Sequence, residues 1–369
     1  MMHKYLFAPL IAAAGFLLAA STGPAMALHG GPNVLITPLG THDGEFCRRD
    51  RALLFEDPNG TTILYDPGMT VRGPTDERLP HTEDNPAHDD ETDPENFVGE
   101  LDVVLVSSVH GDHLGGAHPS AANNGTCGSP STDVPDSPIS NTAEILAGHF
   151  VFGDDDEEEP TGDDDDAVMF IGGEMRDFMR AQVITAGGAS SQVQTLRPGG
   201  TRKLNDVKFH VTVTSHSNGV GRGFLQDATL KANLTLDGLT SYVGPDHGFV
   251  IQFTNGLVVY MTGDTGPLGD MKSIIKDFYG PQLAVVHLGS TFGMGPEEGA
   301  FAVKRLIQPK SVIVTHVNEE GTIGGIVKAN SKTETFIDLV KGTPVHVPLS
   351  GETMEFDGHG KCVSGPAPC

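Results

Sequence analysis

Basic residues are scarce in this sequence. It contains 23 Lys and Arg against 49 Asp and Glu, which gives a formal net charge of −26 at pH 7. Such a negative field repels phosphate backbones, and no Lys/Arg cluster offers the basic stripe that a nucleic-acid enzyme needs. We therefore expect a small-molecule substrate and no nucleic-acid partner. The simplest interpretation of the net charge is that it keeps the protein highly soluble. The charge does not predict an oligomeric state.

Long apolar runs are missing beyond the first residues. Lys4 precedes an apolar run over residues 5–20, and Ala25-Met26-Ala27 then provides a small-residue cleavage pattern. We interpret residues 1–27 as a removed signal peptide. The alternative is a membrane anchor, but Gly15 and the helix-breaking residues that follow leave the run short of the roughly 20 residues of a spanning helix. The mature chain is expected to be periplasmic or secreted, without membrane contact.

Cysteine is also rare, and none of it occurs in a CxxC-type pair. The four residues, Cys47, Cys127, Cys362 and Cys369, allow three pairings. In an exported chain they favour disulfides over free thiols. We expect the local pair Cys362–Cys369, which leaves Cys47–Cys127. The alternative is a cysteine metal ligand, which the spacing does not favour.

Acidic residues are concentrated in two segments. Ten of the 13 residues from Asp154 to Asp166 are acidic, and Thr75–Glu95 is rich in Asp, Glu and Pro. Such runs bury too little apolar surface to offset ordering entropy, so we expect solvated insertions. Calcium binding is the alternative, although the acidic block lacks the spacing of a calcium loop. We predict a single domain over residues 28–369, with acidic insertions near 73–100 and 119–175.

The remaining sequence alternates short β-rich runs with glycine turns. The predicted strands are Asn33–Thr37, Thr61–Tyr65, Asp102–Ser107, Val207–Thr214, Phe249–Phe253, Leu257–Thr262, Leu283–His287 and Ser311–Thr315. Asn255-Gly256 predicts a hairpin between two of them. Pro296, the acidic residues after it and Pro309 bound a predicted helix. A strand-dominated core with connecting helices indicates an α/β (α+β) fold.

One predicted strand ends in a cluster of polar side chains. Val103–Val106 is a continuous apolar run, followed at once by the segment that contains His110, Asp112 and His113. A rigid strand with a glycine-rich exit can direct imidazole and carboxylate groups into one cleft. The alternative for this segment alone is a solvated polar turn.

Three further strand ends carry the same residue types. His216 follows Val207–Thr214, Asp264 follows Leu257–Thr262, and His316 follows Ser311–Thr315. Each alone is compatible with a hydrogen-bonded turn residue. Four strand ends that each deliver a His or an Asp together indicate a metal centre.

At these positions the sequence resembles the metallo-β-lactamase-fold superfamily, in its metal-dependent hydrolase branch near the ascorbate-phosphate lactonases. The resemblance runs from about Asn33 to His316. Its most specific segments are Gly248-Phe249-Val250-Ile251, Gly263-Asp264-Thr265-Gly266, Asp270-Met271 and Met294-Gly295-Pro296-Glu297-Glu298, with Gly40-Thr41-His42 and Leu64-Tyr65-Asp66-Pro67. It implies a four-layer αββα sandwich with metals at one edge of the facing sheets.

The resemblance also implies ligand roles. The His-x-His-x-Asp-His motif of the branch falls on Ser108, His110, Asp112 and His113, so that serine replaces the first histidine. One metal would have the ligands Asp112, His113, Asp264 and His316. The other would have only His110, His216 and the bridging Asp264. A serine hydroxyl is a poor ligand, so we expect one strong site and a weakened second site.

Three further residues are candidates for supporting roles. His118 lies a few residues after the motif and is a possible substitute ligand, although a surface-loop histidine is the simpler interpretation. His42 and Asp66 either orient the ligand imidazoles or close strand-end turns; the sequence does not separate these alternatives.

Together with the predicted signal peptide, the resemblance leads us to expect an exported hydrolase that uses metal-bound hydroxide to cleave a small ester, lactone or related acyl or phosphoryl bond. Asp112 would act both as ligand and as the catalytic group that orients the attacking water. Zinc suits the His and Asp donors best, and manganese or iron is also compatible. The alternative, suggested by Ser108, is a non-catalytic metal-binding protein on the same fold.

Overall fold

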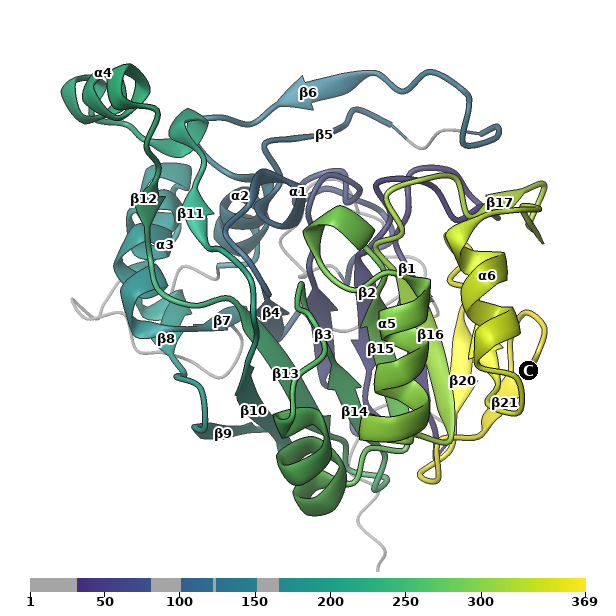
Figure 1. The fold of residues 1–369 in the computed structure, drawn as a ribbon. Coiled ribbons are helices and arrows are strands. Elements are labelled where there is room, and N and C mark those ends of the chain that lie inside the picture. The colour runs from purple at the N-terminus through teal and green to yellow at the C-terminus, as the bar shows by residue number, and fades with distance from the viewer. Residues whose placement is uncertain (1–31, 81–100, 122–123, 151–165) are drawn as a thin grey trace, which may run out of the picture.

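The computed structural model describes residues 32–80, 101–121, 124–150 and 166–369. Two mixed β-sheets face each other, and helices cover their outer sides (Figure 1). The predicted four-layer αββα arrangement is confirmed. The expected signal peptide, residues 81–100 of the first insertion and nearly all of Asp154–Asp166 lie outside the described residues.

The first sheet has eight strands. In spatial order they are β21 (Cys362–Ser364), β20 (Met354–Phe356), β1 (Val34–Pro38), β2 (Leu53–Glu56), β3 (Thr62–Tyr65), β4 (Val103–Leu105), β7 (Val168–Ile171) and β8 (Val193–Thr195). The strands from β21 to β3 pair antiparallel, and those from β3 to β8 pair parallel.

The second sheet has seven strands. In spatial order they are β19 (Val345–His346), β16 (Ser311–Thr315), β15 (Leu283–His287), β14 (Val258–Met261), β13 (His247–Gln252), β10 (Val207–Val213) and β9 (Thr201–Leu204). Three two-stranded ribbons are formed by β5 (Ala117–Pro119) with β6 (Asp133–Pro135), β11 (Gly219–Val220) with β12 (Ser241–Tyr242), and β17 (Thr322–Ile323) with β18 (Ile326–Val327).

Helices pack against both outer faces. On the eight-stranded sheet lie α1 (Gly111–Leu114), α2 (Asn141–Gly148) and α3 (Gly173–Ala186). On the seven-stranded sheet lie η4 (Met271–Tyr279), α5 (Pro296–Phe301), η6 (Ala302–Ile307) and α6 (Lys332–Leu339). The predicted helix from Pro296 is confirmed as α5 and η6, and the Glu298 carboxylate accepts a hydrogen bond from the Gly295 N–H at its start, at 3.1 Å.

Alternating side chains divide the core into three layers. In β15, Leu283 and Val285 face the opposite sheet, whereas Ala284 and Val286 face the helices. This is the two-residue period of a strand that is buried on both faces. The apolar composition of these strands therefore reflects burial on both sides.

The hairpin predicted at Asn255-Gly256 is confirmed between β13 and β14. Gly256 has φ 91°, a left-handed conformation that favours glycine, and the Asn255 side chain accepts a hydrogen bond from the Leu257 N–H at 3.0 Å. The turn connects two antiparallel strands in register, with Ile251 opposite Val259.

Both expected disulfides are present. Cys47 is bonded to Cys127 and Cys362 to Cys369, which leaves no free cysteine in the described part of the chain. The first bond links the loop between β1 and β2 to the segment between β5 and β6. It therefore links two segments that are 80 residues apart in the sequence.

The second expected insertion, residues 119–175, is smaller in the structure than predicted. Its described part includes α2, which packs on the sheet, and β7, which pairs with β4 inside the eight-stranded sheet. Acidic composition thus obscured a core strand, because Val168–Ile171 follows the acidic run directly.

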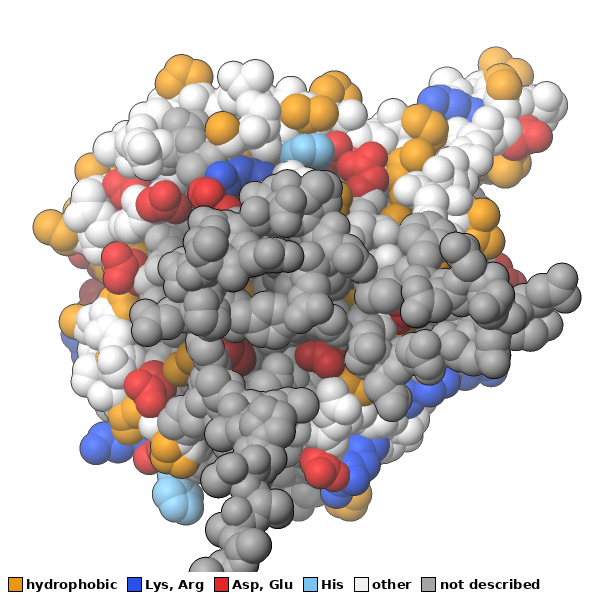
Figure 2. Space-filling view, turned by 180° about the vertical axis from the view of Figure 1, so that it is seen from behind, with side chains coloured by type: hydrophobic (Ala, Val, Ile, Leu, Met, Phe, Trp, Pro, Cys, Tyr) orange, Lys and Arg blue, Asp and Glu red, His pale blue; other side chains and the backbone are white. Residues whose placement is uncertain are grey.

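One helix stands apart from the body. The helix α4 (Ala228–Asp237) buries no residue, and Figure 2 shows it projecting with hydrophobic side chains on its surface. Leu236 is 85% exposed there. No helix in the described ranges is long and apolar enough to cross a bilayer.

Candidate metal centre

The strand directions bring the predicted ligands to one edge. The strands β3 and β4 run parallel in one sheet, and β14, β15 and β16 run parallel in the other. The carboxyl ends of parallel strands lie at the same edge of their sheet. The segments that follow these strands therefore meet, and they carry most of the predicted ligands.

Four of these residues form one compact group, namely Asp112, His113, Asp264 and His316. His113 Nε2 lies 3.0 Å from Asp264 Oδ2 and 3.8 Å from Asp112 Oδ2. His316 Nε2 lies 3.3 Å from Asp112 Oδ2 and 3.6 Å from Asp264 Oδ1. Atoms that bind one ion at 2.0–2.2 Å lie roughly 3–3.6 Å apart. Asp112, His113 and His316 each offer a donor atom within 4.8 Å of the others, and Asp264 contacts both imidazoles, so these side chains suit a divalent cation.

Hydrogen-bonding partners of Nδ1 fix the orientation of the His113 ring. Its Nδ1 lies 2.9 Å from Asp66 Oδ2 and 3.1 Å from the Ser107 hydroxyl. Asp66 is fully buried, and it also accepts a hydrogen bond from the Ser107 N–H at 2.7 Å. With Nδ1 held in this way, Nε2 of His113 faces the centre. Of the two roles considered for Asp66, its contacts support both.

Backbone strain is present at two positions of the site. Asp66 has φ 44° and His316 has φ 52°, both in the left-handed region that side chains other than glycine adopt rarely. Each residue directly follows its strand, β3 or β16. In these conformations Asp66 contacts His113 and His316 contacts Asp112, and backbone strain of this kind is common at functional sites.

A residue missed by the sequence interpretation completes the buried side of the group. His287, the last residue of β15, has Nδ1 3.0 Å from Asp264 Oδ1 and Nε2 3.1 Å from the Tyr65 hydroxyl. Its ring stacks on His316, with centroids 5.2 Å apart. The strand-end pattern that identified His316 applies equally to His287.

Arg51 was also missed. Its guanidinium contacts the Asp112 carboxylate, and its own side chain is only 2% exposed. Burial alone would raise the pKa of Asp112, but His113, His316 and Arg51 outweigh that effect and hold the pKa well below its usual range. Asp112 is therefore ionised at neutral pH, as a metal ligand must be.

Neighbouring charges also shift the pKa values of the buried pair His113 and Asp264. Burial opposes ionisation of both groups, yet the surrounding carboxylates raise the pKa of His113, while His113 and His316 lower the pKa of Asp264. An imidazole nitrogen must be free of its proton to bind a metal ion, so metal binding at this group would compete with protonation of His113.

The other predicted ligands form a second group. The rings of His110 and His216 have centroids 5.1 Å apart at 74°. A carboxylate not predicted from the sequence joins them: Asp246 Oδ2 lies 2.6 Å from His216 Nδ1. Each of the three offers a donor atom, and these atoms lie within 4.8 Å of one another. Ser108, at the position of the missing histidine, is fully buried.

His118 and His42 lie elsewhere. Nδ1 of His118 is 2.6 Å from Asp136 Oδ1, and these two residues form a separate group with Glu144. His118 thus does not supply the ligand missing at position 108. His42 has Nδ1 3.1 Å from the Thr41 hydroxyl, and none of its side-chain hydrogen bonds to described residues goes to a predicted ligand.

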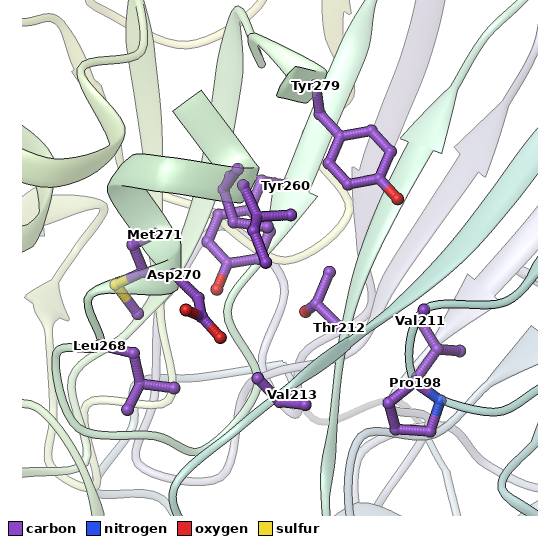
Figure 3. Close-up of a pocket in the computed structure, with 12 residues that line it drawn as sticks. Pro198, Val211, Thr212, Val213, Tyr260, Leu268, Asp270, Met271 and Tyr279 are labelled. Carbon is purple, nitrogen blue, oxygen red and sulfur yellow. The ribbon is translucent and has the colours of Figure 1, made fainter. Parts of the chain in front are cut away.

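A hollow of about 230 Å³ lies near the outer face of the seven-stranded sheet (Figure 3). Tyr260 and Thr212 point into it from neighbouring parts of the sheet, with Asp270 and Met271 beside them from the start of η4. None of the predicted metal ligands lines this hollow. It is therefore separate from the candidate metal centre.

A family model described as a beta-lactamase superfamily domain matches residues 61–317, more than half of the chain. The chain belongs to this family. The match ends one residue after His316 and so includes every predicted ligand, together with Asp246 and His287.

Similar curated proteins are UPF0173 metal-dependent hydrolases. One from Cupriavidus necator is 27% identical over 299 residues, 81% of either chain. One from Rubrobacter xylanophilus is 27% identical over 259 residues, covering 70% of this chain and 75% of the relative. These matches and the site geometry place the chain among the metal-dependent hydrolases.

A solved structure shows the same fold. Igni18, a metallo hydrolase from the archaeon Ignicoccus hospitalis, matches with a TM-score of 0.50 and 22% identity. The match covers 88% of this chain and 99% of Igni18. The two chains therefore share the same fold.

Proposed function

We propose that this chain is an exported hydrolase that cleaves a small, uncharged ester or lactone, or a related acyl or phosphoryl bond, at the group formed by Asp112, His113, Asp264 and His316. The observation that carries the proposal is the convergence of two imidazoles and two carboxylates from both sheets, with nitrogen–oxygen distances of 3.0–3.8 Å between them. The donor set contains two imidazoles and two carboxylates, which suits zinc best and also manganese or iron.

A divalent cation held by this group would lower the pKa of a water toward neutrality and polarise the oxygen under attack. The protein side chains provide the orientation. Asp66 keeps Nε2 of His113 facing inward, and Arg51 keeps the Asp112 carboxylate ionised and in place. Side chains fixed by such contacts need little rearrangement during the reaction.

Exposure indicates the side from which a substrate approaches. His113 and Asp264 are almost fully buried, whereas the Asp112 side chain is 39% exposed. His110, two residues before Asp112 in the sequence, is also partly exposed. A substrate therefore reaches the group past Asp112, so the Asp112 carboxylate is the ligand best placed to orient both the substrate and the attacking water.

Charge and cysteine usage support the remaining parts of the proposal. The net charge of −26 disfavours anionic substrates, which leaves a neutral ester or lactone as the favoured class. Two disulfides suit an oxidising compartment, so we propose a periplasmic or secreted location.

The test measures hydrolysis of a panel of esters, lactones and phosphodiesters before and after chelation, together with metal content. We expect chelation to abolish hydrolysis and added zinc or manganese to restore it. His316→Ala should lower activity by more than about 100-fold. His210→Gln is the matched control, because His210 lies in the same sheet but bonds Thr201 at 2.8 Å. Tight metal binding without hydrolysis of any panel member would instead support a non-catalytic metal-binding protein.

A further inference from the structure

The two imidazoles of the second group, those of His110 and His216, are not enough by themselves to hold a metal ion tightly. His110 and His216 face each other, but the buried residue at position 108 is serine. The Ser108 hydroxyl accepts a hydrogen bond from the His110 N–H at 3.2 Å, so it already has a structural partner. A neutral hydroxyl is in any case a weak ligand for these metals. A third strong donor must come from another residue.

Asp246 lies where such a donor is needed. Its Oδ2 is 2.6 Å from Nδ1 of His216, and its side chain is completely buried. Its Oδ1 is also buried and has no hydrogen-bond partner among the described residues. A buried carboxylate oxygen without a partner is costly, so such an atom indicates a ligand that completes its surroundings.

The fold places Asp246 there by strand pairing. The strands β10 and β13 are antiparallel, and Val213 at the end of β10 is opposite His247 at the start of β13. The residue before β13 and the residues after β10 therefore emerge at the same edge of the sheet. This geometry brings Asp246 to His216 across 30 residues of sequence.

Hydrogen bonds fix the three loops of this group to one another. The buried Asn218 side chain accepts a hydrogen bond from the Val109 N–H at 3.0 Å, and the Asn218 backbone carbonyl accepts one from the Val243 N–H at 3.3 Å. The His247 N–H donates to the Ser107 carbonyl at 2.8 Å. The loops that carry His110, His216 and Asp246 are thus held as one unit, so the donor atoms keep their relative positions.

We propose that Asp246 takes the place of the missing histidine and that His110, His216 and Asp246 bind a second divalent cation beside the first. This inference deepens the proposed function and rests on it for the neighbouring ion. The cation replaces the proton shared by Asp246 and His216, which is released to solvent. Our expectation of a weak second site is thereby revised, because the lost imidazole has a carboxylate replacement.

The substitution changes the chemistry of the second site. A carboxylate adds one negative charge and a hard oxygen donor where the family pattern has a neutral nitrogen. Two imidazoles and one carboxylate with open positions suit iron and manganese as well as zinc. We therefore expect the second site to accept manganese more readily than a three-imidazole site would.

For the test, the full chain is stripped of metal with a chelator and dialysed against zinc or manganese. Elemental analysis then gives the number of bound ions, and calorimetric titration gives their dissociation constants. The wild type should bind two zinc ions. Asp246→Asn, which keeps the side-chain shape, should bind one and raise the dissociation constant of the other by more than about 100-fold. Ser108→His combined with Asp246→Asn should restore two, and Ser108→His alone should leave the count at two.

Two controls make the count specific. His316→Ala should lose the first ion and keep the second, so that failure of the proposed function is distinguished from failure of this inference. Asp136→Asn removes another buried carboxylate that lies 2.6 Å from a histidine, His118, and should leave the count at two. Thermal unfolding of each metal-free variant shows whether it remains folded.

Three outcomes would overturn the proposal. One is a wild type that binds a single ion and gains the second only with Ser108→His. Another is an affinity loss of only about 10–100-fold in Asp246→Asn, the range for a carboxylate that merely orients a ligand. The third is loss of the second ion in Asp136→Asn instead of Asp246→Asn, which would place that ion beside His118.

Discussion

His287 holds one oxygen of Asp264, with its Nδ1 3.0 Å from Oδ1, while Oδ2 of the same carboxylate faces His113. With its Nδ1 protonated, the His287 ring donates to Asp264, and its Nε2 accepts the hydrogen of the Tyr65 hydroxyl, which lies 3.1 Å away. Both oxygens of Asp264 are thereby positioned by imidazoles. The carboxylate predicted to be shared by two ions is thus held at both of its oxygens.

His287→Gln should weaken the first metal site without removing a ligand. The amide cannot reproduce both hydrogen bonds of the imidazole, so we expect zinc affinity to fall by about 10–100-fold. Tyr65→Phe removes only the hydrogen bond to Nε2 of His287, so it should lower the zinc affinity less than His287→Gln does. Competition with a chromogenic chelator measures both, with His210→Gln as the control. An unchanged affinity in His287→Gln would show that Asp264 is held by its other neighbours alone.

Asp264→Ala should remove more metal than His110→Ala. Asp264 lies between the imidazoles of the first group and is predicted to bridge to the second, whereas His110 belongs to the second group only. We expect Asp264→Ala to lose the first ion and to bind the second more weakly, whereas His110→Ala should keep the first ion, as measured by elemental analysis. Equal losses from the two variants would contradict this assignment.

The two disulfides should stabilise the chain unequally. Cys47 and Cys127 are separated by 80 residues, whereas Cys362 and Cys369 are separated by 7. Loop-closure entropy predicts that the double variant Cys47→Ser/Cys127→Ser loses about 4 kcal/mol of unfolding free energy. Replacing both cysteines of the C-terminal pair should lower it by about 2 kcal/mol. Denaturant unfolding of metal-free protein measures these differences, and thiol titration of the denatured wild type should detect no free thiol. A larger loss from the C-terminal pair would be inconsistent with the loop-length argument.

His346 should make stability depend on pH. Its side chain is buried, Nδ1 lies 3.5 Å from Sγ of Cys369, and desolvation lowers its pKa from 6.5 to about 4. The folded state therefore favours the neutral ring. Its stabilising effect is complete above the unfolded pKa of 6.5 and is lost as the pH falls from there toward 4.

Between pH 7 and pH 4 the wild type should lose about 2–3 kcal/mol more unfolding free energy than His346→Gln does. Urea unfolding at a series of pH values measures the difference. His359→Gln, the same substitution at an exposed position near the same end of the chain, is the control. Parallel profiles for the wild type and His346→Gln would disprove the burial argument.

Local sequence patterns predicted most strands correctly because apolar alternation, glycine turns and the Asn255-Gly256 hairpin act over few residues. The edge strands were harder to identify, and so was β2 (Leu53–Glu56), which lies inside the eight-stranded sheet but has only four residues. The strand β7 was hidden by the acidic run that precedes it. Short strands carry little periodic signal of their own.

The rule of a His or Asp at the end of a strand located the residues of the first group, and the resemblance to the superfamily assigned them ligand roles. The same rule applied to Leu283–His287 would have added His287. It could not find Asp246, which comes before its strand. Only an antiparallel strand begins at the edge where parallel strands end, so Asp246 is recognisable only once β13 is known to run opposite to β14.

The sequence by itself determined the residue types of the centre, the strand segments that carry them, and the serine that departs from the family pattern. These are properties of short segments, and each can be read from neighbouring residues. The tertiary structure alone decided which carboxylate faces which imidazole: Asp66 behind His113, Arg51 on Asp112, and Asp246 beside His216. The partners in these pairs lie 30 to 61 residues apart in the chain. Their contact depends on strand order and sheet packing, which no local pattern specifies.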